Sequence, residues 1–296
     1  TIFSALNIIS LIIVLLGDPS FLFVVITNAF WIVLTVIRNA LLYRRINKIC
    51  NIGSLEGALQ NKLSDEDKEL IITNAKKEFF SSIFSVGFIQ SINLIISAKF
   101  SITISNQYLL FDNLMEQIKN IARAPFYTRR PSFAMMVSKN TNLSKETVFL
   151  PIVLSHATFT LGVLFILLFG SAFLEFINSA ILFEPILWTV IGIAGFIERF
   201  TAINNQLFVI INNKIITHIY MPITAFISIS IILLFSWVDN ILLFPLSISI
   251  GYLSYFSWKV SKDNCKYFHH NILSFESNVS FPFILILIFS LCILAF

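Results

Sequence analysis

Three observations predict that this chain is an all-α polytopic membrane protein. Hydrophobic residues make up 57% of its 296 positions and only 12% are charged, which is too apolar for the surface of a soluble domain of this length. Apolar segments long enough to cross a hydrocarbon core of about 30 Å recur along the whole chain. Runs such as LGVLFILLFGSAF are apolar at nearly every position, whereas strands of a β-barrel would alternate apolar with polar residues.

Nine segments have the length and composition of a spanning helix. The chain starts inside the first of them, without a start Met or a charged leader, so we expect it to be part of a longer protein. Proline stands early in several of the later segments, where it can start or kink a helix. The nine segments are 1-17, 20-43, 79-98, 102-124, 147-172, 185-211, 215-236, 241-258 and 279-296.

Lysine and arginine fall in alternate connections between these segments, and this bias sets the orientation of a membrane protein. Fifteen of the 20 basic residues lie in the connections 44-78, 129-145 and 259-266 and at Lys214. The intervening connections contain only Lys99. We therefore expect the basic connections, and residue 1, on the cytoplasmic side.

The segment 44-78 is the one long polar stretch. Its part SLEGALQNKLSDEDKELIITNAKKE is typical of an amphipathic helix, and Gly53 just before it is expected to break the helix. It has the character of a cytoplasmic linker between two membrane lobes. The predicted division is the end of an amino-terminal lobe at 1-43, a linker at 44-78 and a carboxy-terminal lobe at 79-296.

The segment 102-124 carries four charges on one stripe. At 100° per residue, Asp112, Glu116, Lys119 and Arg123 fall within about 60° of one another, with the amides of Asn113 and Asn120 beside them. A charge at the bilayer centre costs at least about 2.5 kcal/mol, so this stripe is expected to face protein or water rather than lipid. The alternative is an interfacial helix whose charges lie among the headgroups.

The segment 185-211 has a second polar seam. Glu198, Asn205 and Asn212 are spaced by seven residues, and Arg199 and Gln206 lie to one side. Two polar helices in one bundle predict a water-filled cavity for a polar solute. Smaller signals come from His156, Gln90, Asn93 and Arg38, although a helix-to-helix hydrogen bond explains His156 equally well and Arg38 can snorkel to the headgroups.

No motif points to catalysis or to a metal. Cys50, Cys265 and Cys292 have no paired spacing, and the sequence has no nucleotide-binding loop, no HExxH and no GxSxG. The external connections are short, which argues against a membrane polysaccharide polymerase or ligase. We expect no enzymatic activity, no cofactor, no metal site and no nucleic-acid partner.

Two stretches resemble a known family. QIKNIARAPFYTRRPSFA and FIERFTAINNQLFVIINNKIITHI are similar to segments of the polysaccharide and O-antigen flippases of the multidrug/oligosaccharidyl-lipid/polysaccharide superfamily. The departures from the family pattern are Phe208 where Tyr is usual, Asn212 where Thr is usual, and Asn204 and Asn205 where His is often found. The positions that match are Ala124, Pro125, Phe126, Tyr127 and Pro131, then Glu198, Arg199, Ala202, Gln206, Leu207, Asn213, Lys214 and His218.

The resemblance implies a flippase of 12 to 14 helices in two lobes, in the bacterial cytoplasmic membrane. Its cargo would be an undecaprenyl-diphosphate-linked oligosaccharide, with other polysaccharide assembly proteins as further partners. Lys119, Arg123 and Arg199 would then attract the diphosphate, and Glu116 or Glu198 would carry a coupling proton or sodium ion. The alternative is a cation-coupled exporter of small amphiphilic or drug-like molecules.

Overall fold

The computed structural model describes residues 34, 37, 41, 65–139, 143–176 and 181–295. The predicted helix 1-17, all but three residues of 20-43 and most of the linker therefore lie outside the described residues. The chain divides into two units, Thr1–Ile72 and Thr73–Phe296, and the helical bundle belongs to the second. Every regular element in the described ranges is helical, which confirms the all-α prediction.

Ten helices are described, and they keep the chain order of the predicted segments. Their bounds are α4 Asp65–Lys99, α5 Ile102–Tyr127, α6 Arg130–Ser138, α7 Lys145–Phe176, α8 Pro185–Asn212, α9 Thr217–Leu234, α10 Leu243–Ser254, α11 Phe256–Tyr267, α12 Ile272–Val279 and α13 Phe281–Ala295.

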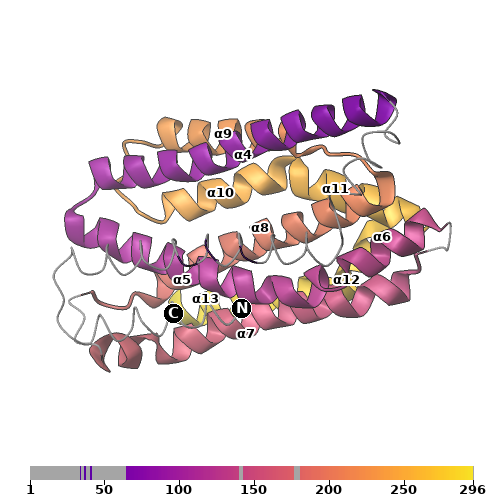
Figure 1. The fold of residues 1–296 in the computed structure, drawn as a ribbon. Coiled ribbons are helices and arrows are strands. Elements are labelled where there is room, and N and C mark those ends of the chain that lie inside the picture. Colours follow the sequence, from indigo (N-terminus) through magenta and orange to yellow (C-terminus); the bar gives the residue numbers. More distant parts are fainter. Residues whose placement is uncertain are drawn as a thin grey trace. The chain divides into compact units, whose positions relative to one another are not determined.

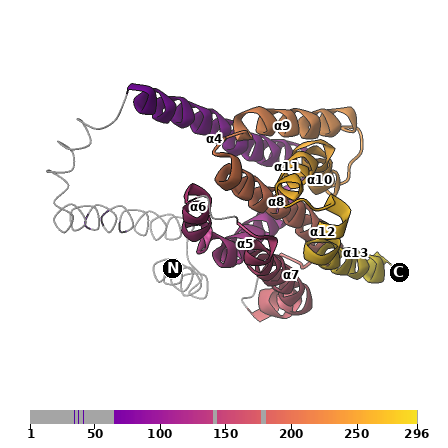
Figure 2. The same ribbon diagram turned by 90° about the vertical axis from the view of Figure 1, so that its right-hand side faces the viewer.

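Helix α8 is the central element of the bundle. In Figure 1 it runs between α10 on one side and α5 on the other, and the end-on view of Figure 2 places it among α4, α10, α11, α12 and α5. Most of its side chains are buried, including Trp188 and Arg199. A helix with buried residues on all sides needs neighbours on all sides, which fits this central position.

Helix α5 packs along α7, to which it is antiparallel, and along α8, to which it is parallel. Ile118 of α5 lies against Gly162, and Ser155 of α7 donates a hydrogen bond to the carbonyl oxygen of Ala122. At the other end of α5, the ring of Phe111 contacts Trp188 at a centroid distance of 5.6 Å. Small residues such as Gly162 let membrane helices approach closely.

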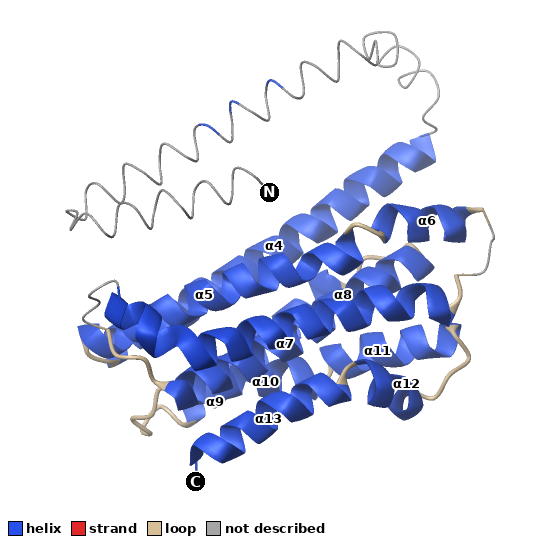
Figure 3. Ribbon diagram, turned by 90° about the horizontal axis from the view of Figure 1, so that it is seen from below, coloured by secondary structure: helices blue, strands red, loops and turns tan. Residues whose placement is uncertain are grey.

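Four described helices are long and apolar enough to cross a membrane, or five if the bent pair α12 and α13 forms one span. Helix α5 is too charged to count among them by composition. It nevertheless lies lengthwise beside α7 in the bundle, as Figure 3 shows, rather than across the helix ends. This placement favours the spanning interpretation of 102-124 over the interfacial one.

Two predicted spans differ from the helices observed. The segment 241-258 is interrupted at Tyr255, whose φ of −148° and ψ of −51° are not helical, so α10 ends after 12 residues and α11 begins. The segment 279-296 is preceded by α12, which meets α13 at a bend of 60°. The described part of the linker continues into α4 without a break, so residue 79 does not start a helix.

The basic and the non-basic connections lie at opposite ends of the bundle. Lys99 donates hydrogen bonds to the carbonyl oxygens of Ser236 and Val238, at 2.5 and 2.8 Å, and Gln107 donates to that of Leu182 at 2.8 Å. The connections after α4, α7 and α9 therefore gather at one end. Helices α6, α11 and α12 lie together at the other end in Figure 1, as the alternation of charge in the sequence requires.

Candidate functional site

A cavity of about 210 Å³ opens between α4, α5, α8 and α10. It lies where the charged stripe of α5 faces the polar seam of α8. Its polar lining is contributed by Gln90, Asn93, Tyr108, Asp112, Asn113, Glu116, Lys119, Glu198 and Tyr252, and its apolar lining by Phe88, Ile89, Ile92 and Ile248.

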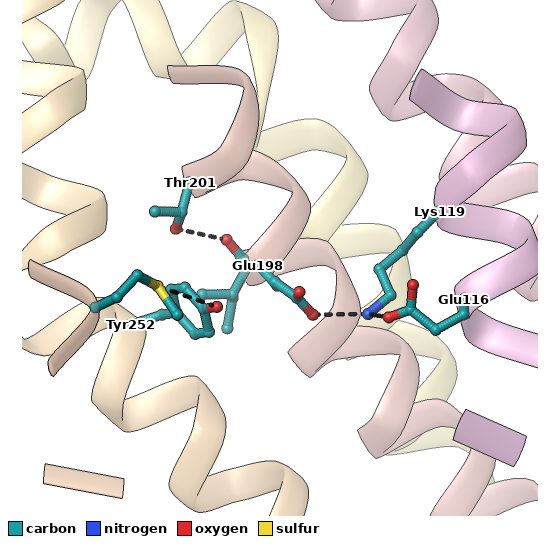
Figure 4. Close-up of polar contacts among 7 residues, drawn as sticks. Glu116, Lys119, Glu198, Thr201 and Tyr252 are labelled. Atoms are coloured by element: carbon teal, nitrogen blue, oxygen red, sulfur yellow. Dashed lines mark hydrogen bonds and ion pairs between the residues drawn. The ribbon is translucent and has the colours of Figure 1, made fainter. Parts of the chain in front are cut away.

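Lys119 joins the two polar helices. Its Nζ atom forms ion pairs with Glu116 on the same helix and, at 2.7 Å, with Oε2 of Glu198 on α8. Figure 4 shows the ammonium group between the two carboxylates, with Tyr252 nearby. The Lys119 side chain is only 6% exposed, whereas the Glu116 and Glu198 side chains are 35% and 28% exposed and reach the cavity.

Five predicted site residues therefore meet in one place: Asp112, Asn113, Glu116, Lys119 and Glu198. The sequence placed the first four on one helix face. Their meeting with Glu198 depends on the packing of α5 against α8, which the sequence does not encode locally.

Arg123 and Asn120 do not line this cavity. Both side chains are exposed, and within the described part of the chain neither forms an ion pair or a side-chain hydrogen bond. Asn120 lies about two helical turns beyond Asn113 on the same side of α5, past the residues that line the cavity. The predicted charged stripe is thus divided: its first three charges face the cavity and Arg123 does not.

Arg199 is buried behind the cavity. It is only 2% exposed, and its guanidinium group lies over the ring of Tyr127 at 5.3 Å. Its Nε and Nη2 atoms have no hydrogen-bond partner among the described residues. Arg130 stacks on the same ring at 5.3 Å, so Tyr127 contacts two arginines.

The remaining polar residues of α8 do not form a single seam. Asn205 is buried between helices and its Oδ1 atom has no partner in the described ranges, whereas Gln206 is half-buried outside the cavity lining. Asn212 donates to the carbonyl oxygen of Phe208 in its own helix. Spacing by seven residues gives a common face, but the neighbours of that face change along α8.

Tyr108, Tyr252 and the amides of α4 complete the cavity. Tyr108 is four residues before Asp112 and so belongs to the same stripe of α5, a position that the helical spacing could have revealed. Gln90 and Asn93 were minor signals in the sequence and now line the site. Tyr252 donates to the sulfur of Met221 at 3.8 Å, and nothing in its sequence surroundings marked it.

A second, larger cavity of about 570 Å³ lies at the break between α10 and α11. Lys259 there forms an ion pair with Asp263 at 2.8 Å, and this hydrogen-bonded partner raises the pKa of the lysine. The lining combines aromatic and basic residues, as surfaces near lipid headgroups do. It consists of Ser254, Tyr255, Trp258, Lys259, Lys262, Lys266 and Ile272.

Comparison of the chain with protein-family models, with curated proteins and with solved structures gives no match. The site is therefore interpreted from its own chemistry. A cavity lined by carboxylates, amides and one ammonium group can bind hydroxyl groups or a cation by hydrogen bonds and charge.

Proposed function

We propose that this chain is part of a membrane transporter that flips a lipid-linked oligosaccharide across the bacterial cytoplasmic membrane. The observation that carries the proposal is the charged cavity between α4, α5, α8 and α10 in a chain of which only 12% of the residues are charged. Intramembrane charges are costly and are found where solutes or ions pass. A transport function accounts for the free-energy cost of these charges, because the charges bind the cargo during its passage. Such binding breaks no covalent bond.

The lining fits the glycan part of such a cargo. Asp112, Glu116 and Glu198 supply acceptors for sugar hydroxyl groups, and Gln90 and Asn93 supply both donors and acceptors. Lys119 is already shared between two carboxylates, which leaves little positive charge for a diphosphate. The diphosphate would therefore be bound outside this cavity, where the exposed side chain of Arg123 is one available cation.

Contact between the two stretches that resemble the flippases supports the proposal. Tyr127 belongs to the first stretch and Arg199 to the second, and the ring and guanidinium group lie 5.3 Å apart. Two residues separated by 72 positions in the sequence thus form a cation–π contact between α5 and α8. A transporter of two lobes and 12 to 14 helices is the proposed whole, with the undecaprenyl-diphosphate-linked oligosaccharide and polysaccharide assembly proteins as its partners.

A cation-coupled exporter of amphiphilic molecules is the second candidate. It is favoured by the excess of acid in the cavity, where three carboxylates face one ammonium group. Such a site attracts cations, including a coupling proton or sodium ion. The same carboxylates would serve a flippase that is driven by an ion gradient.

The test uses a strain that lacks the full-length gene and is complemented with the wild type, with Asp112→Asn or with Glu198→Gln. We expect both variants to accumulate lipid-linked precursor and to lose surface polysaccharide, because they remove cavity charges. Asn120→Ala is the matched control, since Asn120 lies on the same helix outside the cavity. Normal polysaccharide combined with increased drug sensitivity would favour the exporter instead.

A further inference from the structure

A buried polar cluster lies on the side of α8 that faces away from the cavity. Its members are His156 of α7, Ser261 of α11, Glu276 of α12 and Ser280 at the bend between α12 and α13, and each is at most 3% exposed. The ring of His156 stacks near Phe196 and Phe200 of α8, at 5.0 and 6.3 Å. Glu198 lies about 200° around the helix from Phe196, so α8 separates the cluster from the cavity.

A chain of hydrogen bonds connects these residues. Ser261 Oγ donates to Glu276 Oε1 at 2.5 Å, and Ser280 Oγ donates to Oε2 at 2.6 Å. The Oγ atom of Ser280 is also 3.3 Å from His156 Nε2. Both carboxylate oxygens of Glu276 thus have a hydroxyl partner, and Ser280 links the carboxylate to the imidazole.

No Lys or Arg in the described ranges lies within ion-pair distance of the Glu276 carboxylate. Two positive charges lie near other members of this region: the Nζ atom of Lys145 lies over the ring of Phe275 at 5.8 Å, and Arg199 interacts electrostatically with His156. The other titratable group that faces Glu276 is the thiol of Cys265 on α11. A buried carboxylate without a cation is costly to keep charged, so binding a proton lowers that cost.

The hydroxyl of Ser280 lets the cluster accept a proton without losing a hydrogen bond. With Glu276 ionised, the donors run from His156 Nε2–H to Ser280 and from Ser280 to the carboxylate. With Glu276 protonated, its hydroxyl donates to Ser280, and Ser280 donates to the Nε2 atom of His156, whose proton then lies on Nδ1. The Nδ1 atom has no hydrogen-bond partner in the described part of the chain, so a change of tautomer breaks no bond there.

We propose that His156, Ser280 and Glu276 form a proton-binding site that is separate from the α4, α5, α8 and α10 cavity. A proton from water adds at Nδ1 of His156, Nε2 passes its proton to Ser280, and Ser280 passes its own hydroxyl proton to the Glu276 carboxylate, so the cluster gains one proton in total. The hydrogen bonds of the site connect α7 and α11 to the 60° bend between α12 and α13. Protonation therefore changes the hydrogen bonds at this bend. Its use as a coupling site for transport rests on the proposed function, whereas proton binding does not.

The experiment measures proton binding without any cargo. The purified full-length protein in lipid nanodiscs is titrated with acid while infrared difference spectra record protonated carboxyl groups. We expect a buried carboxyl band that appears over a defined pH range in the wild type and is lost in Glu276→Gln. Glu175→Gln, which changes an exposed glutamate, is the control and should retain the band. A band that persists in Glu276→Gln, or no titrating band in the wild type, would overturn the proposal.

A second measurement covers the case in which Glu276→Gln does not fold. Nitrogen resonances of labelled histidine, assigned by loss of the signal in His156→Gln, should change at the same pH as the carboxyl band, because linked groups titrate together. In Ser280→Ala the two changes should separate. An imidazole signal that is insensitive to pH and to Ser280→Ala would exclude the linked site. If Asp112→Asn loses polysaccharide export while the Glu276 carboxyl band titrates as in the wild type, the transport proposal and the proton-binding proposal are tested separately.

Discussion

The Nζ atom of Lys119 lies 2.7 Å from Oε2 of Glu198 and so joins α5 to α8 across 79 positions of sequence. The same ammonium group contacts Glu116, one helical turn before it. One lysine thus holds two carboxylates at the wall of the cavity.

Replacing this lysine should destabilise the bundle. Lys119→Met leaves two carboxylates facing each other without a cation, and loss of a charged hydrogen-bond partner costs about 1–3 kcal/mol. We expect the lower part of that range because both carboxylates reach the cavity and keep some solvation. Thermal unfolding of the purified protein measures the change, with the exposed Lys262→Met as control. In the double variant Lys119→Met with Glu198→Gln, part of the loss should be recovered.

Water should reach one side of α5 and not the other. In a background without native cysteines, Asn113→Cys should react readily with a polar thiol reagent, because residue 113 lines the cavity. Met115→Cys should react slowly, since Met115 is 1% exposed and packs against Gly195. Equal reaction of both cysteines would contradict the cavity.

The contact between α9 and α10 should not tolerate a larger residue at position 251. A methyl group added to Gly251 would overlap Ser228 Oγ and approach the carbonyl oxygen of Thr224 to 2.8 Å. Overpacking of this kind costs about 1–3 kcal/mol, so Gly251→Ala should lower the unfolding temperature. Gly87→Ala is the matched control, because nothing lies within 4 Å of a methyl group there. Gly87→Ala should leave stability unchanged or raise it by up to about 1 kcal/mol.

The contact between the end of α4 and the connection after α9 should be stabilised more by the hydrogen bonds of Lys99 than by its ion pair with Asp239. Lys99 donates to the carbonyl oxygens of Ser236 and Val238, whereas its ion pair with Asp239 spans 3.5 Å and Asp239 is 87% exposed. Exposed ion pairs contribute about 0–1 kcal/mol. Hydrogen exchange in the connection 235–241 should therefore increase clearly in Lys99→Met and little in Asp239→Asn. The reverse order would show that the ion pair is the main tie.

The sequence determined the helical class and the ends at which the connections lie. Hydrophobic runs and the alternation of basic connections carry this information because each depends on residues close together in the chain. Periodicity also put Asp112, Glu116 and Lys119 on one face of α5. It could not show that the stripe divides at Arg123, since that depends on which residues of neighbouring helices enclose the cavity.

Only the tertiary structure decided which polar residues share a site. It brought Glu198 to Lys119, placed Arg199 against Tyr127, and added Tyr252, a residue that no sequence pattern had singled out. It also revealed the cluster at Glu276, an acid that no sequence pattern had singled out. These sites arise from contacts between residues distant in sequence, and the pattern within any one helix does not specify which neighbour will face it.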